Sequence, residues 1–210
     1  MAAPEPSRSR EIELTFDVRA DTPLPDWSGL PGVVAVSAPE VRELDARYLD
    51  ADDLALGRAG FALRRRTGGP DAGWHIKGPR GEDGGRTELH WPLGDDDDDD
   101  VPEGARAVLR AVTGAPLSPL ARIRNSRTAY ALRDADGGVV AEFVDDRVAA
   151  TDERRGVETV WREWEFELGA AAPGDADARA SLFAAAEAAV FAVGGRVAAS
   201  DSKLARTLGL

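Results

Sequence analysis

The chain has 210 residues, 43% of them hydrophobic, which suits one domain with a substantial core and leaves room for an extra helical segment. A net charge of −12 argues against nonspecific binding to nucleic acid or to acidic membranes. The absence of cysteine excludes disulfides and thiolate metal sites. Because neither a signal peptide nor a run of about 18 apolar residues is found, we expect a cytoplasmic protein.

The predicted elements are mainly antiparallel strands. A flexible lead over residues 1–9 is followed by strands at 11–19, 33–37, 41–50, 61–67, 74–78, 86–93, 120–133, 138–149 and 157–168. Residues 22–30 are expected to form a turn or short helix, and helical patterns lie at 54–59, 103–113, 176–193 and 202–208. The acidic run Asp95–Asp100 is expected to be solvated and mobile, since consecutive aspartates lack the spaced ligands of a calcium loop.

Charged residues two apart mark several of these strands, and residues two apart share one face of a strand. The acidic stripes are Glu11–Glu13 and Glu163–Glu165–Glu167, and a basic stripe is Arg64–Arg66. Each stripe taken alone is typical of a solvated face. Stripes of both signs with apolar residues opposite them also suit a polar interior, in which carboxylates bind Mg²⁺ and arginines bind phosphate oxygens.

Motifs of several enzyme classes are absent. The chain has no P-loop, no dinucleotide-binding glycine motif and no nucleophile elbow. Its two histidines, His75 and His90, do not have zinc-ligand spacing.

The order of the charged motifs resembles that of the CYTH domain, or triphosphate tunnel metalloenzyme, superfamily. Glu11 and Glu13 match the family's N-terminal E-x-E-x-K strand, except that Thr15 stands in the lysine position. Further matches follow in chain order: Tyr48–Asp50, Arg64–Arg66, Lys77, Arg86–Glu88, Arg127 with Asn125 in a lysine position, Asp145, Glu163–Glu165 and Ser200–Lys203. Together these matches cover about residues 10–208, so residues 10–210 are interpreted as one such domain.

The resemblance implies an α+β fold, an eight-stranded antiparallel β-barrel or tunnel with a charged lumen and several outer helices. It implies hydrolysis of a triphosphate, with inorganic triphosphate as the leading substrate, and Mg²⁺ or Mn²⁺ as cofactor. By similarity the phosphates contact Arg64, Arg66, Lys77, Arg127 and Lys203. The metal ligands are Glu11, Glu13, Glu163, Glu165 and Glu167, and the catalytic carboxylates are Glu11, Glu13, Glu88 and Asp145.

Alternatives remain open at this point. Thr15 and Asn125 each remove a positive charge from the expected lumen, which favours a non-catalytic module that binds polyphosphate or nucleotides. Thiamine-triphosphatase and class IV adenylate cyclase activities are also compatible, with Trp27 or Tyr48 near a tunnel mouth as a stacking residue or as simple packing. The C-terminus resembles the place where a CHAD helical domain follows in longer relatives.

Overall fold

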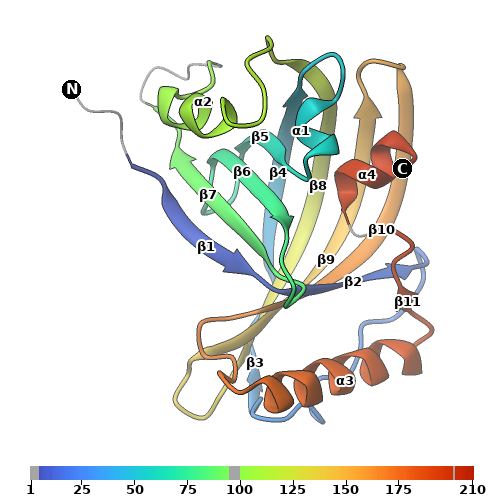
Figure 1. Ribbon diagram of the computed structural model, residues 1–210. Coiled ribbons are helices and arrows are strands. Elements are labelled where there is room, and N and C mark those ends of the chain that lie inside the picture. Colours follow the sequence, from blue (N-terminus) through green and yellow to red (C-terminus); the bar gives the residue numbers. More distant parts are fainter. Residues whose placement is uncertain (1–4, 95–99, 201) are drawn as a thin grey trace.

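A computed structural model describes residues 5–94, 100–200 and 202–210 (Figure 1). In these ranges the strands are β1 Ser7–Glu11, β2 Glu13–Val18, β3 Ala35–Val36, β4 Glu40–Asp50, β5 Ala62–Thr67, β6 Gly73–Arg80, β7 Arg86–Pro92, β8 Ser118–Arg133, β9 Val139–Asp152, β10 Val157–Leu168 and β11 Arg196–Val197. The helices are α1 Ala55–Arg58, α2 Glu103–Leu109, α3 Ala176–Ala192 and α4 Lys203–Leu208.

All of these strands belong to one curled antiparallel sheet. Their order is β1-β7-β6-β5-β4-β8-β9-β10-β2-β11, and β3 pairs with β8. The predicted class, an antiparallel α+β tunnel, is confirmed. The strand count differs, because eleven strands occur in the described residues where the resemblance implied eight. The N-terminal strand is divided in two, and β3 and β11 are additional two-residue strands.

The segment 7–18 joins the two ends of the sheet. β1 pairs with β7, and β2, which follows after Ile12 alone, pairs with β10. One continuous stretch of chain therefore closes the sheet around an interior, and Figure 1 shows this stretch crossing between the two sides. The predicted flexible lead was wrong for residues 7–9, which pair with residues 88–90 of β7.

Apolar side chains pack on the outside of the sheet, beneath helices. Leu182, Ala186 and Val190 of α3 are buried in one cluster with Phe16 and Phe166. A second cluster joins α2 to β5, β6 and β7; its buried members are Leu56, Leu63, Trp74, Ile76, Trp91, Val101, Ala105 and Leu109. Because strand side chains alternate between faces, this packing turns the charged stripes inward.

Local sequence explains two of the connections. At α1, the buried carboxylate of Asp50 accepts hydrogen bonds from the backbone N–H groups of Ala51, Leu56 and Gly57, at 2.7, 2.9 and 3.0 Å. At the β5–β6 turn, Gly68 has φ +76°, and a Cβ there would lie 1.9 Å from the carbonyl oxygen of Glu43. Only glycine fits that turn.

Two sequence predictions near the sheet differ from the structure or lie outside it. Of the turn or short helix expected at 22–30, the structure has the turn, near residues 28–30, whereas the predicted strand 33–37 is reduced to Ala35–Val36. The predicted mobile run falls at 95–99, outside the described residues, while Asp100 is exposed.

Candidate active site

The interior of the curled sheet holds a cavity of about 830 Å³. Side chains of both charges line it, and they come from β1, β2, β4, β5, β6, β7, β8, β9, β10 and the start of α4. Its charged lining includes Glu11, Glu13, Arg42, Arg64, Arg66, Lys77, Arg86, Glu88, Arg127, Glu142, Glu163, Glu165, Glu167 and Lys203. The two-residue spacing seen in the sequence thus corresponds to one shared interior face.

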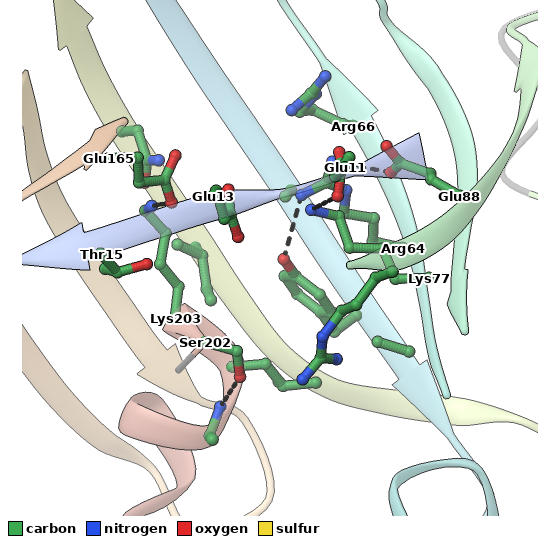
Figure 2. A pocket seen from close by; sticks show the side chains of 18 of the residues that line it. Glu11, Glu13, Thr15, Arg64, Arg66, Lys77, Glu88, Glu165, Ser202 and Lys203 are labelled. Carbon is green, nitrogen blue, oxygen red and sulfur yellow. Dashed lines mark hydrogen bonds and ion pairs between the residues drawn. The ribbon is translucent and has the colours of Figure 1, made fainter. Parts of the chain in front are cut away.

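One wall of the cavity joins β1, β5, β6 and β7. Lys77 Nζ lies 2.6 Å from a carboxylate oxygen of Glu11, and Arg64 Nη2 donates to Glu88 Oε1 at 3.2 Å. Figure 2 shows these four side chains converging from different strands. The same oxygen, Glu88 Oε1, also lies 2.8 Å from His75 Nδ1. The other ring nitrogen, His75 Nε2, lies 3.0 Å from the carbonyl oxygen of Asp71.

Arg66 projects into the same wall and is nearly buried. Its guanidinium forms an ion pair with Asp71, which belongs to the β5–β6 turn and is half exposed. Burial, with repulsion from Arg64 and Arg127, lowers the pKa of Arg66 to about 9. Arg66 is therefore still a cation near neutral pH and is available to an anion that replaces Asp71.

The opposite wall joins β8, β9, β10 and α4. Arg127 donates to Asp146 at 2.7 and 2.8 Å and to Glu165 at 2.7 Å. Lys203 Nζ lies 2.9 Å from Asp146 and 2.6 Å from Glu163, and it also pairs with Glu165. Burial alone would raise the pKa of Glu165, but Lys203 and Arg127 outweigh it and hold that pKa well below its usual range.

Two carboxylates of the cavity, Glu11 and Glu167, have raised pKa values. Glu13 and Glu167 lie opposite each other on β2 and β10. Burial raises the pKa of Glu167 to about 8, and repulsion from Glu11 and Glu13 adds to the shift. Burial also raises the pKa of Glu11 to about 7 against the opposing effect of Lys77. Around Glu167, burial and repulsion between carboxylates outweigh the attraction of Lys77, which suits this part of the cavity to a cation.

A carboxylate trio could hold a metal ion. In the described part of the chain, Asp146, Glu163 and Glu165 each offer an oxygen, and these oxygens lie within 4.8 Å of one another. Hard oxygen donors of this kind suit Mg²⁺ or Mn²⁺.

Most of the predicted site residues line the cavity, but Asp145 does not. Its carboxylate points to the outer face, where it accepts from Arg162 Nε and Nη2 at 2.7 and 2.9 Å and from Trp164 Nε1 at 3.0 Å. The placement of Asp145 in the lumen was wrong. Its neighbour Asp146 occupies the inner face, opposite Glu163 on β10 and Arg127 on β8.

Sequence reasoning also missed His75 as a partner of Glu88, and it left the two aromatic residues unresolved. Trp27 packs in the outer core, with ring centroids 4.7 Å from Phe143 and 5.6 Å from Phe166. Tyr48 lines the cavity, and its hydroxyl accepts from Arg64 at 3.4 Å. Asp146 lies directly across from Arg127, so knowledge of the β8–β9 register would have identified it as the inward-facing aspartate. The sequence alone does not provide that register.

The two positions that depart from the family pattern are both inside. Thr15 lines the cavity beside Glu165, its partner across β2 and β10. Asn125 is buried and donates from Nδ2 to Asp146 Oδ2 at 3.3 Å. Figure 2 places Thr15 on the same side of the cavity as Lys203.

Comparison with known families decides the classification. The family model described as the CYTH domain matches residues 9–190. The chain belongs to the CYTH domain family. Membership of this family agrees with the carboxylate trio, which could hold a metal ion.

The curated relatives of this CYTH domain are longer proteins. Two proteins named as uncharacterized, from Mycobacterium tuberculosis strains CDC 1551 / Oshkosh and ATCC 25618 / H37Rv, are 39% identical over 217 residues. Those alignments cover 99% of this chain but 42% of each relative. The chain therefore spans less than half the length of the curated relatives it matches.

Solved structures share the fold of this CYTH domain at low identity. A putative adenylate cyclase from Bacillus halodurans has a TM-score of 0.63 at 18% identity, covering 95% of this chain and 97% of its own. A putative adenylyl cyclase from Hippeastrum, described as having a dominant triphosphatase activity, has a TM-score of 0.53 at 16% identity, covering 95% of each chain. Among the described residues, no helix is long and apolar enough to cross a membrane.

Proposed function

We propose that this CYTH domain hydrolyses a triphosphate inside its tunnel with the help of Mg²⁺ or Mn²⁺, and that inorganic triphosphate is the leading substrate. One observation carries the proposal: clustered carboxylates and clustered cations face a single cavity of about 830 Å³. Such a cavity can bind a metal ion and a phosphate chain side by side. Its resident ion pairs balance the charges when neither is bound.

The metal would be held by carboxylates on β1, β2, β9 and β10. The proposed ligands are Glu11, Glu13, Glu163, Glu165 and Glu167, to which the structure adds Asp146. When bound, the ion would neutralise phosphate charge and favour a water nucleophile. The donor set fits, because all of these ligands are oxygens and Mg²⁺ is commonly shared between carboxylates and substrate phosphates.

The phosphate chain would be held by the cations on the remaining surface. The proposed contacts are Arg64, Arg66, Lys77, Arg127 and Lys203. Arginine can bind two phosphate oxygens at once, and lysine acts as a point charge. Phosphoryl transfer depends mainly on positioning and electrostatic stabilisation, which these residues supply.

Glu88 has a positioning role in this proposal. It lies between His75 and Arg64, at 2.8 and 3.2 Å. Burial lowers the pKa of His75 to about 4, so the ring is neutral at pH 7. A neutral ring has one N–H, so the tautomer that donates from Nδ1 to Glu88 does not also donate to the Asp71 carbonyl. In that tautomer Glu88 fixes the direction of the Arg64 guanidinium.

The second candidate function is a binding module for polyphosphate or nucleotides that has lost its chemistry. Thr15 and Asn125 favour it, because each puts a neutral side chain where the family pattern has lysine. Thiamine-triphosphatase and adenylate cyclase activities are further candidates, and the exposure of Tyr48 to the cavity is the feature that favours them. A CHAD-type helical partner domain in a longer parent chain also stays a proposal.

Phosphate release from inorganic triphosphate, measured with Mg²⁺, with Mn²⁺ and with EDTA, distinguishes a triphosphatase from a binding module. The test variant is Glu11→Gln/Glu13→Gln, and Glu158→Gln, an exposed glutamate of β10, is the control. Release that needs metal and the N-terminal pair supports a triphosphatase. Saturable triphosphate binding without release would instead establish the binding module, and parallel assays with ATP and thiamine triphosphate decide the substrate.

A further inference from the structure

Lys203 occupies the position that a metal ion would take. Its ammonium contacts all three members of the carboxylate trio, Asp146, Glu163 and Glu165, and its side chain is only 11% exposed. The same three residues are the set that could coordinate a metal in the described part of the chain. An ammonium and a divalent ion cannot share this space, because their charges repel strongly at contact distance.

Lys203 belongs to a helix, whereas the three carboxylates of the trio belong to strands. The three carboxylates belong to β9 and β10, which pair along twelve successive positions. Lys203 is the first residue of α4, a helix of six residues that follows Ser202. In Figure 2 its long side chain reaches from α4 to Glu165 beside β2. Rotation of this one side chain would free the trio without disturbing the sheet.

Removing Lys203 from the trio would leave it a cation inside the same cavity. The phosphate-binding surface proposed above, including Arg127, lines that cavity too. A bound phosphate chain would give the ammonium a new partner of opposite charge. The exchange would then release the trio to a metal ion while adding one positive charge to the anion site.

We propose that Lys203 is a built-in cation that keeps the Asp146–Glu163–Glu165 trio closed to metal until a phosphate chain draws its ammonium away. The inference rests on the proposed function and deepens it, because it makes metal and anion binding depend on each other. Such linkage is reciprocal, so each ligand must raise the affinity for the other. Thr15 leaves room for the arrangement, since a second lysine at that position would compete for Glu165.

Binding of Mn²⁺ alone tests the inference, followed by electron paramagnetic resonance of the free ion. The background is Glu13→Gln/Glu167→Gln, which removes two competing carboxylates and leaves the trio intact. In that background, Lys203→Gln is expected to tighten Mn²⁺ binding by about tenfold or more. Lys203→Arg, which keeps the charge, is expected to resemble the parent, and adding Glu163→Gln to Lys203→Gln is expected to abolish the gain.

An unchanged Mn²⁺ isotherm for Lys203→Gln would overturn the inference while leaving a metal-dependent triphosphatase possible. Absence of Mn²⁺ binding in every variant and in the wild type would overturn both proposals. Folding is checked by thermal unfolding in EDTA. If Lys203→Gln unfolds too readily for titration, the rise in its melting temperature with Mn²⁺ serves instead, and that rise is expected to exceed the parent's.

A second arm adds imidodiphosphate, a phosphate chain that resists hydrolysis. It is expected to tighten Mn²⁺ binding more in the parent than in Lys203→Gln, because only the parent has an ammonium to move. Equal enhancement in both would contradict the exchange.

Discussion

At the scale of single residues, two adjacent aspartates of β9 lie on opposite faces of the sheet and have different partners. Asp145 joins Arg162 and Trp164 on the outer face, and Asp146 joins Arg127 and Lys203 on the inner face. Their matched chemistry makes the pair a direct test of which face carries the activity.

Asp145→Asn is expected to lower stability by about 3 kcal/mol, because it breaks a well-buried ion pair, yet to leave phosphate release per folded molecule unchanged. Asp146→Asn is expected to reduce release roughly 10- to 100-fold. Urea unfolding and a phosphate assay measure the two effects. A larger loss of release in Asp145→Asn than in Asp146→Asn would contradict the assignment of faces.

Glu167 leads to a prediction about pH. Because burial raises its pKa to about 8, the folded state keeps a proton that the unfolded state has lost above about pH 5. The contribution of Glu167 to stability is therefore fully present at low pH, falls as pH rises through about 8 and levels off above it, and each pKa unit corresponds to about 1.4 kcal/mol. Denaturant unfolding in EDTA between pH 5 and 9 should show this fall in the wild type and a flatter profile in Glu167→Gln.

The affinity for metal is expected to depend on pH in the opposite direction to the stability of the metal-free protein. Metal ions bind the ionised carboxylate, so Mn²⁺ affinity is expected to increase over the same pH range. The exposed Glu158→Gln control should keep both wild-type profiles. A wild-type stability that rises between pH 6 and 8 without metal would rule out the protonated Glu167.

At the scale of elements, α1 depends on one side chain. Asp50 satisfies three backbone N–H groups and is 2% exposed, so no solvent replaces it. Asp50→Ala is expected to cost about 3 kcal/mol, since buried donors would lose their acceptor. Asp50→Asn, which keeps one acceptor oxygen, should cost less. Comparable losses for both variants, measured by thermal unfolding, would show that the carboxylate does not act through these bonds.

Strand periodicity predicted the faces of isolated stripes well. In β5 and β10, residues two apart share a face, so Arg64 with Arg66 and Glu163 with Glu165 could be grouped from spacing, while the resemblance placed both pairs inside. In β9 the two aspartates are adjacent and both faces are partly covered, so spacing does not choose between them. The choice depends on register with β8 and β10, a long-range property.

Among the helices and strand ends, too, some features follow from local sequence and others depend on contacts that are distant along the chain. Helix α3 and its apolar face follow from local sequence, and the prediction of 176–193 nearly matches Ala176–Ala192. The strand at Ser7–Glu11 does not follow from local sequence, because its residues are mostly polar and exposed. Its pairing with β7 depends on a partner far along the chain. Ion pairs such as Lys203 with Glu163 were likewise invisible before the fold brought α4 to β10.

At the scale of the whole molecule, closure of the sheet depends on segment 7–18. Removing residues 1–10 is expected to release β7 from β1 and to break the ion pair between Arg10 and Asp83. Hydrogen exchange should therefore accelerate in β7 while α3, which packs on the far cluster, stays protected. Removal of residues 1–4 alone is the control. Unchanged protection of β7 after the longer deletion would show that β1 is dispensable.

The same closure has a consequence for how the protein is made. β2 pairs with residues 162–167 of β10, so it waits for about 150 further residues to be synthesised before it finds its partner. Contacts this distant form slowly, and unpaired strand edges favour aggregation in the interval. Lys203 arrives later still, which means that a nascent chain holds three clustered carboxylates without their lysine. A divalent ion bound to the trio at that stage would stabilise a late folding intermediate, as any ligand stabilises the state that binds it.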